Sequence, residues 1–171
     1  MCKENSFETE NDYFYQKIRK MQQTLDVTRT SRNILSQMLA GYTLEQLNKI
    51  PEGYKNNLIW NIAHVVVVQQ VLVYKLSGIP MMISDEMVEK YKKGSKPEHI
   101  ATQAEVDEIK TLLTETINQT ETDLESKIFI NYQEYPTSAG IVLKSASDAI
   151  AFNDFHEGLH IGIIMSIRKF I

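Results

Sequence analysis

Four long segments of this chain carry apolar residues at alternating spacings of three and four, and no segment shows convincing strand alternation. The first segment shows the spacing in the order Ile18, Met21, Leu25, Thr28, Arg32, Leu35 and Leu39. Such spacing places a stripe of side chains on one face of a helix, which must be buried against another element. With no sheet to cover those stripes, the helices must cover each other. The pattern therefore predicts an all-α fold, a four-helix bundle.

The remaining long helices have recognisable limits. The second is expected from about Tyr54 to Leu76, and its four valines at 65–68 make it apolar nearly all round. Such a helix is buried on more than one side, against the bundle or against a second subunit. The third is expected to begin near Thr102, and the fourth near Ser145. If neighbouring helices are antiparallel, the topology is up-down-up-down.

Short helices are expected in the connections. Thr43 and Gln46 are spaced as a capping box for one short turn, and Ser84 opens a second short helix that Gly94 ends. Residues 129–144 form an irregular link. No repeat or interdomain linker is visible, so we expect a flexible N-terminus over residues 1–12 and a single domain over residues 13–171.

Composition excludes several classes of protein. The net charge of −4, with no basic stripe, argues against nucleic-acid binding. The single cysteine, Cys2, rules out a disulfide framework. Gln69, Gln70 and Lys75 interrupt the most apolar run before it reaches the ~18 residues of a membrane span. The polar, acidic first residues are unlike a secretory signal, so we expect a cytoplasmic protein without membrane contact.

Three of the four histidines suggest a function. His156 and His160 are four residues apart in the last helix, so their side chains project from one face about 5–6 Å apart. His64 lies about ten residues into the second helix, and His156 and His160 lie about eleven and fifteen residues into the fourth. At ~1.5 Å per residue these depths correspond to ~15, ~17 and ~22 Å. Three imidazoles at one level would bind a divalent metal and leave coordination positions open.

Trp60, Asn61 and His64 in the apolar second helix, followed by His156-Glu-Gly-Leu-His160 in the last, resemble the DinB/YfiT-like metalloenzyme superfamily. The resemblance covers essentially the whole chain. It implies a four-helix bundle, commonly a homodimer, whose ligands His64, His156 and His160 hold Zn²⁺, Ni²⁺ or Fe²⁺. Some members transfer a low-molecular-weight thiol, bacillithiol for example, onto an electrophile. Ile163 is a departure, because the family often has Gln three residues after the final histidine.

Two reactions and one binding role stay open. A divalent metal would lower the pKa of a bound thiol or water, which suits either a thiol S-transferase or a hydrolase acting on a small molecule. A non-catalytic bundle that binds a metal or a small ligand is the third possibility, and a structural dimer whose histidines have no remaining function stands beside these three. Asn61 and Asn153 each lie three residues before a histidine and are candidates to orient an imidazole by hydrogen bonding.

Other polar residues receive simpler interpretations. Glu157 and Asp154 are expected at the surface or behind the ligands, and His99 in a solvated loop. Arg32 lies on the first helix's apolar seam, where it would extend to solvent, pair with a carboxylate, or reach the site as an anion clamp.

Overall fold

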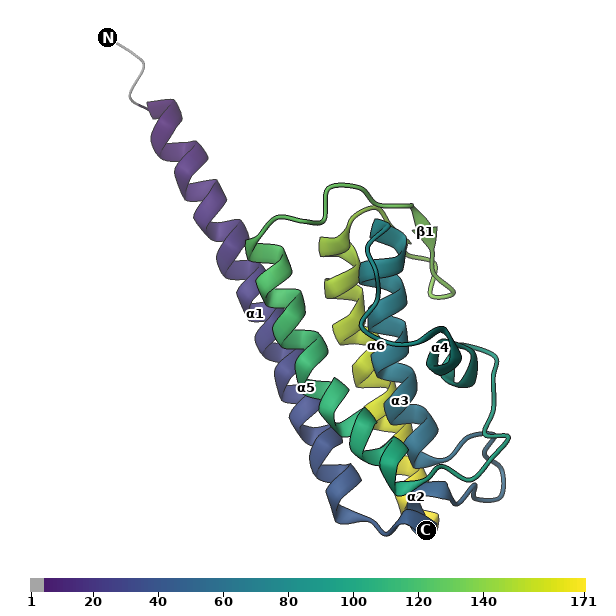
Figure 1. Cartoon of the computed structure of the whole chain (residues 1–171). Coiled ribbons are helices and arrows are strands. Elements are labelled where there is room, and N and C mark those ends of the chain that lie inside the picture. Colours follow the sequence, from purple (N-terminus) through teal and green to yellow (C-terminus); the bar gives the residue numbers. More distant parts are fainter. Residues whose placement is uncertain (1–4) are drawn as a thin grey trace.

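The computed structural model describes residues 5–171, and helices account for most of them (Figure 1). The long helices are α1 (Asn5–Gly41), α3 (Leu58–Gln69), α5 (Gln103–Glu125) and α6 (Ala146–Ile167). The chain continues from α3 through a π-helical turn, η1 (Gln70–Tyr74), and a 3-10 turn, η2 (Lys75–Ser77). Shorter elements are α2 (Leu44–Asn48), α4 (Asp85–Tyr91), β1 (Tyr135–Pro136), β2 (Val142–Leu143) and the 3-10 turn η3 (Arg168–Phe170). The all-α class is confirmed. The expected flexible segment overlaps α1 from Asn5 onward, and residues 1–4, with Cys2, lie outside the described residues.

Local sequence signals set several helix ends. The predicted capping box of Thr43 and Gln46 is present, and Ser84 and Ser145 cap α4 and α6 through their hydroxyls. The second long helix begins at Leu58 rather than near Tyr54, because Asn57 adopts an extended backbone and its side chain accepts a hydrogen bond from the Trp60 amide. A two-residue antiparallel pair, β1 with β2, lies within the link that was expected to be irregular.

The directions of the helices differ from the predicted alternation. Gln69 bonds Thr120 and Tyr74 bonds Asp123, so the α3 segment and α5 run parallel. Asn61 contacts His160 whereas Tyr54 contacts Ser166, so α3 and α6 run antiparallel. The topology is therefore up-down-down-up, and the up-down-up-down expectation is corrected. The physical reason is the long connection from η2 to α5, which leads back to the end of the bundle where α3 began (Figure 1).

The second long helix is the central element of the core. Val65, Val66 and Val67 are buried, and Val68 packs partly buried against the cluster that contains Leu25 and Tyr74. The predicted packing role of the valine run is confirmed. Residues Leu58–Ser77 are long and apolar enough to span a membrane, but 83% of the most apolar 18 residues are buried inside the protein, as expected of a core helix. Burial on all sides therefore accounts for its composition.

Candidate metal centre

His64 of α3 and His156 and His160 of α6 form one cluster. One ring nitrogen from each lies within 4.8 Å of the others. The ring centroids are 5.2 Å apart for His64 and His156, 4.8 Å for His64 and His160, and 4.6 Å for His156 and His160. The predicted convergence is confirmed, but matching depths imply convergence only if the two helices run parallel, and α3 and α6 run antiparallel. His64 lies in the middle of α3, and His156 lies in the middle of α6 with His160 one turn further on, so antiparallel packing of the two helices brings these parts together.

Two of the three imidazoles have a defined tautomer. His64 Nδ1 lies 2.5 Å from the Tyr91 carbonyl oxygen, and His160 Nδ1 lies 2.9 Å from Asn61 Oδ1. The Asn61 amide is itself oriented, because its Nδ2 donates to the Asn57 carbonyl at 2.7 Å. Both partners of the imidazoles are acceptors, so each Nδ1 carries a proton and donates it. The lone pairs are then on Nε2, the arrangement that a metal requires.

Burial keeps these imidazoles neutral. It lowers the pKa of His156 to about 3, with further contributions from His160, His64 and Arg32. Burial, together with His64, lowers the pKa of His160 to about 4. The pKa of His64 is also lowered, mainly by burial, although its hydrogen bond to Tyr91 opposes the shift. Neutral imidazoles are the form that binds metal, so the donor set suits a divalent metal at pH 7.

The long connection after α3 forms part of this centre. Besides the Tyr91 carbonyl, it supplies Ser95, whose hydroxyl accepts a hydrogen bond from Trp60 Nε1 at 3.1 Å. Trp60 in turn stacks on His64, with ring centroids 4.6 Å apart and an interplanar angle of 13°. The sequence marks this connection as long, but a backbone carbonyl carries no residue signature. The role of Tyr91 was therefore missed.

A buried ion pair lies beside the histidines. Arg32 and Glu157 approach to 2.8 Å with side chains 3% and 0% exposed, and Asn153 Nδ2 donates to Glu157 Oε1 at 2.6 Å. Of the three roles expected for Arg32, the structure shows pairing with a carboxylate, that of Glu157. Glu157 was expected at the surface or behind the ligands, and the surface alternative is wrong. Burial raises its pKa while Arg32 opposes that shift.

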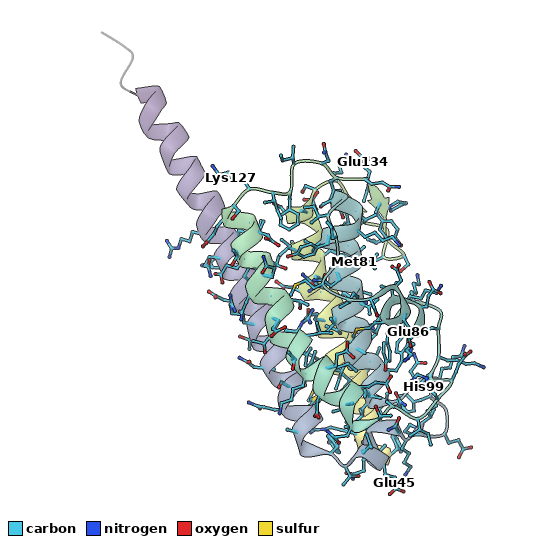
Figure 2. All side chains as sticks on the ribbon, in the orientation of Figure 1. Glu45, Met81, Glu86, His99, Lys127 and Glu134 are labelled. Carbon is cyan, nitrogen blue, oxygen red and sulfur yellow. The ribbon has the colours of Figure 1, made fainter. Side chains whose placement is uncertain are left out.

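The remaining predicted polar residues form contacts other than with the clustered imidazoles. Asn153 bonds to Glu157, and no hydrogen bond to an imidazole is described for it. Asp154 accepts a hydrogen bond from Thr28 at 2.5 Å, and burial raises its pKa to about 6. His99 lies on the exposed connection between α4 and α5, where it contacts Glu105 (Figure 2).

A cavity of about 350 Å³ opens onto the three histidines. Its wall includes Trp60, Asn61 and two residues near the end of α6, Ile163 and Ile167. Ile163 occupies the position where the family often has Gln, so this part of the wall is apolar here. Lys55 and Lys93 also line the cavity, from two different connections, and neither was predicted from the sequence to do so.

Comparison with known proteins agrees with this geometry. The family model of the DinB superfamily matches residues 28–164, more than half of the chain. The chain belongs to the DinB superfamily. The predicted family is thus confirmed, and the histidine cluster of this DinB-superfamily protein lies within the matched region.

Solved structures support the fold alone. The crystal structure of a conserved protein from Enterococcus faecalis has a TM-score of 0.55 and 13% sequence identity, covering 88% of this chain and 95% of that protein. No curated protein matches the chain. The similarity to the Enterococcus protein is too low in sequence to transfer an activity.

Proposed function

We propose that this protein binds one divalent metal through Nε2 of His64 and His160 and one ring nitrogen of His156, and acts as a metal-dependent thiol S-transferase on a small electrophile. The observation that carries the metal site is the pair of hydrogen bonds from His64 to Tyr91 and from His160 to Asn61. Each directs an Nε2 lone pair into the cluster before any metal binds. Zn²⁺, Ni²⁺ and Fe²⁺ all accept imidazole nitrogen.

When bound, the metal would lower the pKa of a thiol at the centre, so that the thiolate predominates at neutral pH. The protein's own residues bind and enclose the reactants. Trp60 forms a stacked wall against His64, and Ile163 and Ile167 supply apolar surface for an electrophile. The hydrogen bonds of Tyr91 and Asn61 hold two imidazoles in position throughout.

The cavity lining favours thiol transfer over hydrolysis. Among the described residues that line the cavity, none is Asp or Glu. Hydrolysis of a carbonyl substrate needs a group that moves a proton from water to the leaving group. Histidine does this most often, followed by Glu or Asp, and the three histidines of this cavity would be taken up by the metal. A thiolate has already lost its proton, so it can attack an electrophile without a proton-transferring side chain. We therefore place the hydrolase and the non-catalytic binding role behind the transferase.

Metal content is the first measurement. Elemental mass spectrometry of the purified protein should find close to one Zn²⁺, Ni²⁺ or Fe²⁺ per chain. The His156→Ala, His160→Ala double variant should lose it, and His99→Ala, which alters an exposed histidine away from the cluster, should keep it. If the parent stays metal-free after loading with each of the three ions, the metal site and the enzyme are both rejected.

Thiol transfer is tested on the loaded protein. With 1-chloro-2,4-dinitrobenzene as electrophile, a thiol sulfur forms the new C–S bond and chloride leaves. A rate that requires both thiol and metal and disappears in the double variant supports the transferase. Metal binding with no acceleration for any thiol would support the non-catalytic role instead.

A further inference from the structure

Two lysines stand at the opening of the histidine cavity on separate connections. Lys55 lies between α2 and α3, and Lys93 lies two residues after the end of α4. The chain has 22 acidic and 18 basic residues, so a randomly placed cavity would meet acids at least as often as bases. This cavity has two lysines and, among its described lining residues, no carboxylate. Its opening is therefore positive although the protein is negative.

Among the residues described, neighbouring lysines in and just after α4 form ion pairs with carboxylates, whereas Lys55 and Lys93 do not. Lys90 pairs with Glu86 and Glu105, and Lys92 pairs with Glu89. In the part of the chain that the structure describes, neither Lys55 nor Lys93 has a carboxylate partner. Their ammonium groups are thus available for a ligand.

The same cavity contains an unsatisfied amide. Asn56 lines it beside Lys55, and Asn56 Oδ1 is buried with no hydrogen-bond partner. A buried acceptor without a donor costs about 1–3 kcal/mol, so such atoms usually meet a ligand or water. Asn56 thus adds a polar group to the lining beside Lys55, whereas Ile163 and Ile167 of α6 make their part of the lining apolar.

We propose that Lys55 and Lys93 bind the anionic group of a small thiol whose sulfur reaches the three histidines, so that the cosubstrate is an anionic thiol. This inference rests on the proposed function and names the chemical class of its cosubstrate. Opposite charges at the rim also attract an anionic ligand during its approach. Lys55 and Lys93 select the ligand and take no part in bond formation.

Binding of two thiols of similar size tests the charge selection. Isothermal titration calorimetry on Ni²⁺-loaded protein compares mercaptosuccinate, which has two carboxylates, with neutral 1-thioglycerol. We expect mercaptosuccinate to bind at least tenfold more tightly. In Lys55→Gln, Lys93→Gln its Kd should rise about tenfold, the sum of two partly exposed ion pairs, while that of 1-thioglycerol stays unchanged.

The matched control is Lys49→Gln, Lys96→Gln. It removes the same charge from the same two connections, but neither lysine lines the histidine cavity. Equal affinity of the parent for the two thiols, or an equal loss in the control, would overturn the inference.

Failure of the proposed function gives a different result. Succinate, which has the carboxylates but no thiol, is titrated into the metal-free parent and into both double variants by NMR. If the protein holds no metal, or no thiol binds to the loaded protein, the transferase fails. Succinate binding that depends on Lys55 and Lys93 alone would still support the anion subsite, and binding equal in all variants would remove it.

Discussion

The imidazole of His160 is held by a side-chain amide, whereas the imidazole of His64 is held by a backbone carbonyl. Substitution can remove the first contact and leave the second. Asn61 is therefore the point at which the orientation of a ligand can be changed without changing a ligand. Its fixed amide, bonded to the Asn57 carbonyl, explains why the oxygen faces His160.

Asn61→Ala should weaken metal affinity about 10–100-fold, the usual effect of losing a hydrogen bond that orients a ligating histidine. Chelator competition measures the affinity. Asn153→Ala is the comparison, because Asn153 is also buried three residues before a histidine but bonds to Glu157. It should leave affinity within about threefold of the parent. Equal losses in the two variants would contradict the assignment of Asn61.

Removing one partner of the Arg32–Glu157 pair should strongly destabilise the fold. Replacing both partners with apolar residues should change its stability little. Arg32→Met alone leaves a fully buried carboxylate without its cation, at a cost of about 3–5 kcal/mol in the free energy of unfolding. The double variant Arg32→Met, Glu157→Leu removes both charges and should recover most of that loss. Urea unfolding of the two single variants and the double variant measures the coupling. A single-variant loss below about 1 kcal/mol would show that the pair is hydrated.

At this scale the three histidines were predictable from the sequence and their hydrogen-bond partners were not. The i, i+4 spacing of His156 and His160 is a local property of one helix. The choice between Asn61 and Asn153 depends on how α3 and α6 face each other. Asn61 contacts the histidine of the other helix rather than His64 on its own, and no spacing along one helix reports that.

Helix ends were predictable because they depend on neighbouring residues. Thr43, Ser84, Thr102 and Ser145 all cap the helices that their sequences indicate. The direction of α5 was not predictable, because the connection before this helix is long enough to lead to either end of the bundle. The hydrogen bonds between α3 and α5 that settle the direction join residues about 50 positions apart.

The N-terminus of α5 should show a clear pH dependence. Partial burial favours the neutral form of Glu105, but the Thr102 amide, Lys90 and His99 outweigh it and lower its pKa to about 2, from an ordinary value of 4.5. A lowered pKa means that this stabilisation is complete above pH 4.5 and is lost as pH falls toward 2. Glu105→Gln keeps a capping amide and removes the charge. It should cost on the order of 2 kcal/mol at pH 7 and nothing near pH 2.

Unfolding by urea across pH 2–7 measures this difference. Glu115→Gln, an exposed change on the same helix, is the control and should match the parent throughout. A deficit in Glu105→Gln that stays constant with pH would instead indicate lost packing.

For the whole molecule, metal binding and folding should be linked. The three nitrogens converge only when α3 and α6 are packed, so the metal binds the folded state. Free Zn²⁺ at 100 times its Kd should add about 2.7 kcal/mol to the free energy of unfolding. For a chain of this length that is a rise of about 5–10 °C in Tm. Differential scanning calorimetry should find this rise in the parent and in His99→Ala, and none in the double variant that lacks His156 and His160.

The homodimer stays a prediction, and we expect its interface on the exposed apolar face of α6. Phe155 and Leu159 are each 51% exposed and Ile163 is 41% exposed, at successive spacings of four that align them in one stripe. Glu157 is the only charged residue between Phe155 and Met165, and it is buried, so this part of α6 adds no exposed charge to the stripe. A two-fold axis would place the stripe against itself. Leu159→Glu puts a carboxylate at its centre and should convert a dimer to a monomer in light scattering coupled to size-exclusion chromatography. Ile100→Glu, on the exposed connection before α5, should remain dimeric, and a monomeric parent at tens of micromolar would contradict the assignment.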